Sequence, residues 1–339
     1  MSTAPVVVAA VPAPLFAELF SHDDEQRLHA AAHALGGAFA RVDRLDEMGT
    51  DDLRLDAVRV VLTSWGAPPF DDALLARLPR LQLVAHIGAS VKGFATEALF
   101  DRGVVVTQAG AAMARPVAEV SLAFTLALLH RIPSMHNALR DSVGWDDAGA
   151  AGPQHEILGA PIAVIGASRT GRAYLELVRL LGAEPLLVDP TLDAAQAAAL
   201  GAELVPLDEA LRRARIVAVH APTLPETHHL IGRRELALMP DGAGLVNTAR
   251  SWLVDETALL DEVRSGRLSA AIDVFDEEPL PADSPFRGLP HVLLTPHRAA
   301  GTVEGRLRQG RIVADEVTAF AEGRPLVETV DREQLASMA

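Results

Sequence analysis

Residues 161–172 read PIAVIGASRTGR, an apolar run that breaks into a glycine turn and then into a polar segment. A strand, a tight turn and a helix in this order let backbone N–H groups at the helix start face a pyrophosphate. Gly166 and Gly171 keep the outer glycines of the G-x-G-x-x-G pattern, and Ser168 replaces the middle one. The stretch indicates a dinucleotide-binding βα unit, although an ordinary βα turn is the alternative reading.

A carboxylate follows the next apolar run. Residues 186–190 read LLVDP, which places Asp189 about 20 residues after the first glycine, as the ribose-binding acid of such units requires. A carboxylate there accepts hydrogen bonds from the ribose hydroxyls and repels a 2′-phosphate. We therefore predict NAD and not NADP as the cofactor, with a solvated turn aspartate as the alternative.

Short apolar runs alternate with helical patterns in both directions from this turn. This alternation is typical of α/β folds with parallel sheets. Two doubly wound parallel sheets are expected, the first from runs at 6–9, 58–62, 81–85 and 104–106, the second from runs at 162–165, 186–188, 216–219, 244–246, 270–272 and 292–294.

The connecting segments give further expectations. One long helix is predicted over residues 116–140, a flexible loop over 141–153, and a helix over 303–320 that returns to the first domain. Nothing after that last helix is expected to complete a third sheet.

Length and composition narrow the function classes. The 339 residues exceed the size of one core, so two domains are expected. A net charge of −15 without a basic run argues against a nucleic-acid partner. The absence of cysteine, of a signal-like start and of an apolar run longer than residues 120–129 predicts a soluble, cytoplasmic protein without membrane contact.

Three further segments lie at expected strand ends, where ligands bind in such sheets. They read LVNTAR at 245–250, AIDVFDEEP at 271–279 and LTPHRA at 294–299, and they carry Arg250, Asp273, Glu278 and His297. Singly, each of these residues fits a surface turn; together and in this order they are specific.

The set closely resembles the D-isomer-specific 2-hydroxyacid dehydrogenases. The likeness extends to Leu158-Gly159, to residues 220–232 (HAPTLPETHHLIG) and to Pro116-Val-Ala-Glu119. It implies two Rossmann-like domains with an active-site cleft between them, a homodimer, and interconversion of a 2-oxo acid and a D-2-hydroxy acid. The substrate-binding domain would span 1–112 and 299–339, and the NAD-binding domain 113–298.

The resemblance also assigns roles. His297 would be the acid/base and Glu278 its carboxylate partner, which would fix the tautomer and stabilise the charged imidazole. Arg250 would hold the substrate carboxylate and carbonyl oxygen, and Asp273 would face the nicotinamide carboxamide. The expected cofactor contacts are Gly166, Ser168, Arg169, Thr170, Gly171, Asp189, Ala221, Pro222, Thr227, Thr248, Ala249, Arg250, Asp273 and His297.

The expected substrate loop departs from the family pattern of a glycine-rich turn ending in Asp. It keeps Gly88, but Ser90 replaces the second glycine and Lys92, the only lysine of the chain, replaces the acid. Gly88, Ala89, Ser90 and Lys92 are expected substrate contacts. Lys92 and Arg298 could select a second anionic group on the substrate; the alternative is that Lys92 points to solvent and Arg298 pairs with an acid.

Other functions remain open on the sequence alone. Within the fold they are oxidation of another small anion such as phosphite, or an NAD-sensing scaffold of the corepressor type. No metal site is expected, because His22, His29 and His33 lack clustered acids, and His228 and His229 are expected at the surface. His86 and Gln108 end first-domain strands and are weaker candidates for substrate contact.

Overall fold

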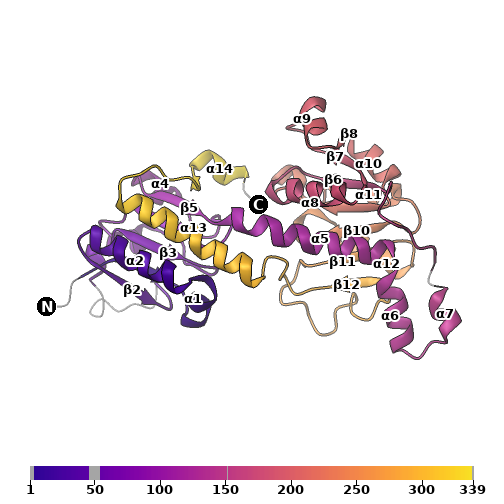
Figure 1. Cartoon of the computed structure of the whole chain (residues 1–339), viewed down its shortest axis with the longest axis horizontal. Coiled ribbons are helices and arrows are strands. Elements are labelled where there is room, and N and C mark those ends of the chain that lie inside the picture. The colour runs from indigo at the N-terminus through magenta and orange to yellow at the C-terminus, as the bar shows by residue number, and fades with distance from the viewer. Residues whose placement is uncertain (1–3, 46–53, 151, 338–339) are drawn as a thin grey trace. The chain divides into compact units, whose positions relative to one another are not determined.

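The computed structural model describes residues 4–45, 54–150 and 152–337, and it divides the chain into two compact units. Unit 1 consists of Met1–Met113 and Gly301–Met338, and unit 2 is centred on Ala114–Ala300. Both units are α/β, each with its own sheet (Figure 1). The chain therefore crosses from one unit to the other twice.

The sheet of unit 1 has the order β13-β5-β4-β3-β1-β2, parallel except for β13. Its first four expected strands are present with shifted ends, whereas β2 and the antiparallel β13 were missed. The strands are β1 Pro5–Ala10, β2 Ala38–Val42, β3 Val60–Thr63, β4 Leu83–His86, β5 Val105–Gln108 and β13 Thr329–Val330.

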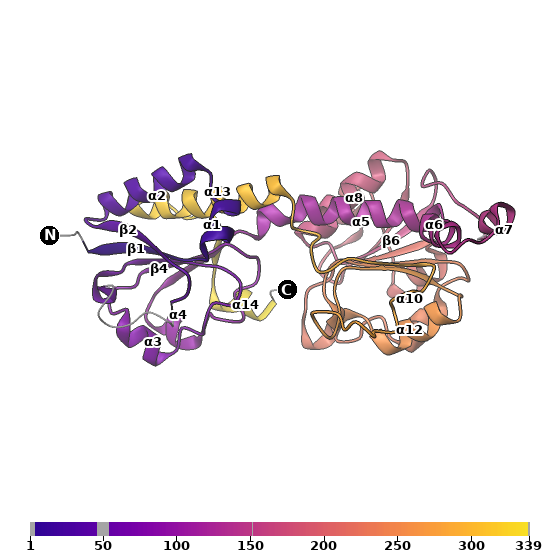
Figure 2. The ribbon, with the colours of Figure 1, turned by 90° about the horizontal axis from the view of Figure 1, so that it is seen from below.

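Helices cover both faces of this sheet (Figure 2). Buried side chains of α1, α2 and α13 pack on one face, and those of α3 and α4 on the other. Helix α13 packs closely on α1, since a Cβ on Gly310 would clash with the carbonyl oxygen of Leu19. The helices are α1 Ala13–Leu19, α2 His22–Ala34, α3 Asp72–Arg77, α4 Glu97–Asp101, α13 Val303–Ala321 and α14 Arg332–Ser337.

The sheet of unit 2 is parallel throughout, with the order β12-β11-β10-β9-β6-β7-β8. The strand order reverses between β6 and β9, and such a switch point is where doubly wound sheets bind nucleotides. The strands are β6 Pro161–Ile165, β7 Glu184–Val188, β8 Glu203–Leu204, β9 Ile216–Val219, β10 Gly244–Asn247, β11 Ser269–Ile272 and β12 Val292–Leu294. Strand β8 was not expected.

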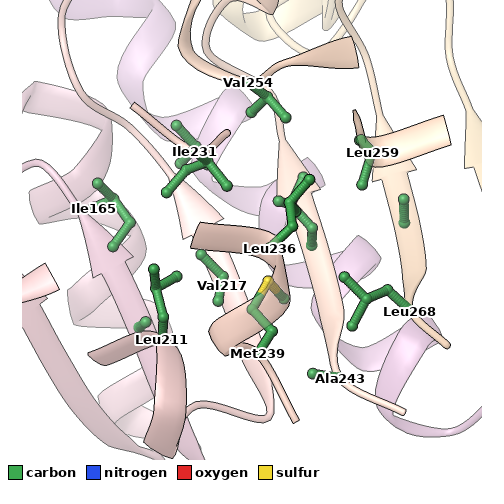
Figure 3. Packing of buried hydrophobic residues seen from close by; sticks show 14 of the residues in the cluster. Ile165, Leu211, Val217, Ile231, Leu236, Met239, Ala243, Val254, Leu259 and Leu268 are labelled. Atoms are coloured by element: carbon green, nitrogen blue, oxygen red, sulfur yellow. The ribbon is translucent and has the colours of Figure 1, made fainter. Parts of the chain in front are cut away.

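Two hydrophobic cores hold unit 2 together, one on each face of the sheet. Leu211, Leu236 and Leu259 from three different helices close over the strands on one face (Figure 3). Helices α5 and α8 cover the other face (Figure 2). The helices are α5 Ala114–Leu129, α6 Ile132–Arg140, α7 Trp145–Gly149, α8 Arg169–Leu180, α9 Ala194–Ala199, α10 Leu207–Arg213, α11 Arg233–Leu238 and α12 Glu256–Arg264.

The expectation of one helix over 116–140 is wrong. The chain breaks at Arg131, whose φ of +53° is left-handed, so that α5 ends at Leu129 and α6 starts at Ile132. The segment expected as a flexible loop contains α7. Apolar periodicity continues through the break, which explains why it was not visible in the sequence.

The helical stretch Gly110–Leu129 is long and apolar enough to cross a membrane by length and composition. The apolar run of residues 120–129 is by itself too short for a membrane span, but the helical stretch begins ten residues earlier. Half of the stretch is buried, and Ala118, Phe124 and Leu128 belong to the core beneath α8. This is the burial expected of a core helix in a soluble protein.

Candidate functional site

The glycine turn after β6 leaves no room for larger residues at two positions. Gly166 has a φ of +100°, and a Cβ there would lie 2.6 Å from the Cα of Ala221. A Cβ on Gly171 would lie 2.1 Å from the carbonyl oxygen of Gly166. Both glycines are therefore required for the close approach of β6, α8 and the loop after β9.

Ser168, which stands in place of the middle glycine, caps helix α8. Its hydroxyl accepts a hydrogen bond from the N–H of Gly171 at 3.2 Å. Arg169 and Thr170 form the first turn of the helix, Arg169 exposed and Thr170 half-buried. First-turn N–H groups have no acceptor within the helix and carry the positive end of its dipole, so the turn fits a pyrophosphate.

Asp189 follows β7 and is tied to the same turn. Its carboxylate accepts hydrogen bonds from the N–H of Ala167 at 2.7 Å and from the N–H and hydroxyl of Thr191 at 2.9 and 2.6 Å. Burial alone would raise the pKa of Asp189, but these hydrogen bonds together hold it below its usual value. The group is thus a fixed anion beside the glycine turn, as ribose binding requires.

The loop after β9 forms the opposite wall of the turn. Ala221 is buried against Gly166, and Pro222 follows it. Thr227 is engaged inside this loop: its hydroxyl donates to the carbonyl of Pro222 at 2.8 Å and accepts from the N–H of Leu224 at 2.8 Å. Thr227 therefore shapes the loop, which was not anticipated.

Three strand ends of unit 2 bring the expected catalytic groups together. His297 Nδ1 donates to Glu278 Oε2 at 2.7 Å, and Glu278 Oε1 accepts from the N–H of Phe275 at 2.9 Å. The carboxylate is fixed at both oxygens, so the imidazole is held with its proton on Nδ1 and with Nε2 turned to other partners. The φ of His297 is +51°, a strained conformation for a residue with a side chain.

Arg250 follows β10, and its guanidinium donates a hydrogen bond to the carbonyl of Ala249. Burial lowers the pKa of Arg250, and the charge of Glu278 acts in the opposite direction. The guanidinium stays charged. The side chain of Asn247 builds the turn before it, donating to the Arg250 carbonyl at 2.9 Å and accepting from the N–H of Ala249 at 3.1 Å.

Asp273 lies in the core of this arrangement with 1% of its surface exposed. Its carboxylate accepts hydrogen bonds from the hydroxyl of Thr295 and from the N–H groups of Arg298 and Ala299, the latter two at 2.9 and 3.0 Å. Its carbonyl accepts the N–H of His297 at 2.8 Å. Asp273 therefore braces the loop that presents His297, a role that the sequence did not suggest.

The remaining expected residues of unit 2 surround these groups. Thr248 is buried, and its hydroxyl lies 2.7 Å from that of Ser121 on α5; Ala249 is half-buried. A pocket of about 710 Å³ opens beside the pair of His297 and Glu278 and is also lined by Phe275, Leu280 and Arg287. The pair thus faces a space large enough for a small ligand.

Sequence reasoning missed Glu256 at the start of α12. Its carboxylate accepts the N–H of Asp276 at 2.8 Å and so anchors the segment that carries Glu278. Burial raises the pKa of Glu256, and the charges of Asp276 and Glu278 add to this effect. No spacing rule in the sequence connects Glu256 to Glu278.

The expected substrate loop lies at the end of β4 in unit 1. Gly88 is buried, Ala89 and Ser90 are half-buried, and Lys92 is exposed. A Cβ on Gly88 would lie 2.5 Å from His86 Nε2 and 3.2 Å from Trp65 Nε1. His86 is buried, which lowers its pKa to about 4, so the imidazole is neutral near pH 7.

Two neighbours of this loop were not expected. Trp65 follows β3 with half of its surface exposed, and the guanidinium of Arg306 from α13 lies 5.9 Å from its ring centre. Arg306 also reaches Glu18, at 3.1 Å. The side chain of Gln108, by contrast, has a structural role, because it accepts a hydrogen bond from the N–H of Gly110.

Comparison with known proteins decides the family. A family model described as "D-isomer specific 2-hydroxyacid dehydrogenase, NAD binding domain" matches residues 122–299. Glyoxylate reductase from Aeropyrum pernix is 33% identical over 285 residues, covering 82% of this chain and 83% of that protein. The chain belongs to the D-isomer-specific 2-hydroxyacid dehydrogenase family. The residues that match this NAD-binding-domain model all lie within unit 2, and NAD is the cofactor.

Other members of the dehydrogenase family agree in fold. D-3-phosphoglycerate dehydrogenase from Mycobacterium bovis is 37% identical over 266 residues, but the chain spans only 50% of that protein. A phosphoglycerate oxidoreductase structure from Rhizobium etli has a TM-score of 0.76 at 26% identity and covers 97% of this chain and 99% of its own. Rhodotorula graminis D-mandelate dehydrogenase, at 23% identity and a TM-score of 0.80, covers 97% of this chain and 98% of its own and shares the two-domain fold.

The histidines outside the candidate site form no metal centre in the described part of the chain, where no group of three metal-binding side chains occurs. Helix α2 carries three exposed histidines, which are His22, His29 and His33. His228 and His229 stack on each other at 3.9 Å, and His228 lies 4.1 Å from the ring of Trp252.

Proposed function

We propose that this protein is an NAD-dependent oxidoreductase that interconverts a 2-oxo acid and a D-2-hydroxy acid. The observation that carries the proposal is the 2.7 Å pair of His297 and Glu278, in a chain of the 2-hydroxyacid dehydrogenase family. Bound NADH supplies the hydride to the substrate carbon. All other steps are assigned to side chains of this chain.

His297 is the proposed acid/base. With Nδ1 held by Glu278, the Nε2 of a protonated imidazole donates its proton to the substrate oxygen as the carbonyl is reduced, and takes it back in the oxidative direction. The carboxylate of Glu278 favours the imidazolium that this step requires. Asp273 is a proposed positioning residue, because it braces the loop of His297.

Arg250 is the proposed anchor for the substrate carboxylate and carbonyl oxygen, since a planar guanidinium binds such oxygens in pairs. The loop of unit 1 with Gly88, Ala89, Ser90 and Lys92 is proposed to contribute N–H groups and one cation to the same substrate. This assignment makes unit 1 the substrate-binding domain. The exposed position of Lys92 and Arg298 is compatible with selection of a second anionic group.

The cofactor residues are proposed from the switch point of the sheet. The turn of Gly166, Ser168, Arg169, Thr170 and Gly171 would bind the pyrophosphate and Asp189 the adenosine ribose. The remaining proposed contacts are Ala221, Pro222, Thr227, Thr248 and Ala249, and the hydroxyl of Thr227 also shapes the loop after β9.

The direct test is a panel of 2-oxo acids that covers short, branched, aromatic and dicarboxylate side chains, with NADH consumption followed by absorbance. Reduction of at least one 2-oxo acid to the D-hydroxy product is expected. Phosphite oxidation with NAD is measured in parallel, because it would replace the proposal with the second chemistry. Tight NADH binding without turnover of any acid would instead favour an NAD-sensing scaffold.

We also propose that the protein is a cytoplasmic homodimer that associates through unit 2. Apolar side chains are exposed at the end of this unit, with Ile132 52%, Leu139 48% and Trp145 81% accessible. Exposed apolar groups gathered in this way are typical of association surfaces. Sedimentation analysis of wild-type protein and of Trp145→Asp, which is expected to weaken the dimer, provides the check.

A further inference from the structure

A second pocket lies at the edge of the unit 2 sheet where the strands begin, away from the strand ends that carry the candidate site. Its volume is about 490 Å³. The floor is apolar and includes Leu128, Leu129 and Ile216. Its polar lining is basic and comes from Arg131, Arg213, Arg215 and His155. No role in the proposed dehydrogenase chemistry involves this edge of the sheet.

Two of these arginines have no carboxylate partner among the described residues. Arg131 donates to the carbonyls of Gly242 at 2.9 Å and Pro153 at 3.4 Å, and Arg215 donates to His155 Nε2 at 3.0 Å. Backbone carbonyls and a neutral imidazole leave both positive charges uncompensated. Several other arginines of the described residues form ion pairs with acids, whereas these two do not.

The other charged groups around the pocket are already compensated. Arg213 pairs with Glu203 and Glu209, both at 2.6 Å. Asp241 lies at the rim with its side chain 89% exposed and is 3.6 Å from Arg267. No other acid lines the pocket. The charges without an acidic partner at the pocket are therefore those of Arg131, which is half-buried, and Arg215, which is exposed.

The position of Arg131 is fixed rather than free. Its backbone is left-handed at φ +53°, which costs free energy for a residue with a Cβ, and its guanidinium is held by the two carbonyls. Such strain persists only where the surroundings determine the conformation. A cation held in this way is preorganised for an anion, since little side-chain entropy remains to be lost on binding.

We infer that this pocket binds a small organic dianion, a phosphate monoester or a dicarboxylate, between Arg131 and Arg215, with its carbon skeleton on the apolar floor. Planar guanidinium groups match the paired oxygens of both anions. The two uncompensated charges match a dianion better than a monoanion. This site is separate from the proposed catalytic function and does not depend on it.

His155 gives the site a proton-linked signal. Burial and the charges of Arg215 and Arg131 lower the pKa of His155. Of the groups facing it in the pocket, Arg131, Arg213, Arg215 and Asp241, the uncompensated positive charges dominate. A bound dianion neutralises them, so the pKa of His155 is expected to rise on binding of a ligand that is still doubly charged at that pH.

The experiment uses the full-length protein with inorganic phosphate and succinate as separate probes, at constant ionic strength set with chloride. Calorimetry is expected to give saturable binding of at least one probe with a Kd on the order of 1 mM. The same titration followed by NMR is expected to show a rise in the pKa of His155. Binding of phosphate alone or of succinate alone identifies the class of ligand.

Arg215→Gln is the deciding variant, because its exposed side chain can be shortened without loss of the strand hydrogen bonds of its backbone. Affinity is expected to fall at least about tenfold. Arg212→Gln is the matched control: it removes an exposed arginine of α10 that pairs with Asp208 and does not line the pocket. In His155→Gln the contribution of the imidazole is lost, and the remaining pH dependence of binding is expected to be that of the probe's own protonation.

Three results would overturn the inference. They are the absence of saturable binding of both probes, equal loss in Arg215→Gln and Arg212→Gln, or an unchanged pKa of His155 at saturation. NADH binding and turnover are not used as readouts, so failure of the proposed dehydrogenase activity would leave this test intact.

Discussion

His297 combines three constraints on one residue. Its ring is fixed by Glu278, its backbone N–H by the carbonyl of Asp273, and its φ of +51° is left-handed. A general acid needs a fixed direction for its proton, and these contacts supply it. The strain at His297 is therefore consistent with a residue placed for chemistry rather than for packing.

His297→Asn is expected to lower turnover of the best 2-oxo acid about 10²- to 10⁴-fold, because the positioned proton donor is lost. NADH binding, measured by fluorescence, should be unchanged. Glu278→Gln should reduce turnover less, since it keeps an acceptor for Nδ1 but loses the charge. His136→Asn on α6 is the control and should behave as wild type. Near-normal turnover of the His297 variant would contradict the mechanism.

Asp189 is the single residue that we expect to determine the choice between NADH and NADPH. Asp189→Ala removes the fixed anion beside the glycine turn, so the KM for NADH should rise by at least about tenfold, as loss of a charged hydrogen bond implies. The KM for NADPH should change little or fall, because repulsion of the 2′-phosphate is relieved. Steady-state kinetics with both cofactors measures this, and an unchanged preference would refute the role of Asp189.

At the scale of elements, the glycine turn joins β6, α8 and the loop after β9 through atoms that leave no space for a side chain. Gly166→Ala would place a Cβ 2.6 Å from Ala221 in a left-handed conformation. The clash adds to a conformational cost of about 1–2 kcal/mol.

NADH affinity and the thermal midpoint of Gly166→Ala are both expected to fall. Gly266→Ala separates the two causes: Gly266 is also left-handed at φ +78°, but a Cβ there would meet nothing within 4 Å. The control should lose some stability and keep NADH affinity. Equal NADH binding by both variants would show that the close packing at Gly166 is dispensable.

The elements also show what the sequence could and could not predict. The long β-branched runs and the glycine turn were sufficient for ten strands, because a continuous apolar run buried on both faces has few alternatives. Short strands such as β8 and β13 have two residues each and no such signal. The break at Arg131 depends on carbonyls of Pro153 and Gly242, which are remote in the chain.

The candidate site divides in the same way. Arg250, Glu278 and His297 could be named because each ends a recognisable strand in a known order. The bracing contacts of Asp273, Glu256 and Asn247 could not, since they depend on which atoms meet after folding. For the same reason no sequence pattern predicts the contact between Trp65, which follows β3, and Arg306 of α13.

At the scale of the whole molecule, each unit contains a buried neutral histidine. Burial lowers the pKa of His220 in unit 2 to about 3 and that of His86 in unit 1 to about 4. The unfolded chain binds a proton on each near pH 6.5, and the folded chain does not. Stability contributed by these groups is therefore present above pH 6.5 and is lost as the pH falls from there towards 4 and 3.

The expected loss from His220 between pH 7 and pH 5 is about 2 kcal/mol, by linkage of folding to proton binding. His220→Asn removes the titrating ring and should flatten the pH dependence of the free energy of unfolding by that amount. Urea unfolding at the two pH values measures the difference. The exposed variant His136→Asn should retain the wild-type slope, and an unchanged slope for His220→Asn would contradict the neutral state of the buried ring.

The chain passes from unit 1 to unit 2 and back again, and this path has an evolutionary consequence. The proton donor, its carboxylate, the guanidinium and the nucleotide turn are all encoded within one uninterrupted stretch of the gene, whereas the other unit is encoded by two flanking pieces. Exchange of both flanks together, at junctions near Met113 and Gly301, would change selectivity while leaving the chemistry in place. Recombination at one junction alone would instead join halves of two different folding units, so successful chimaeras should be double crossovers.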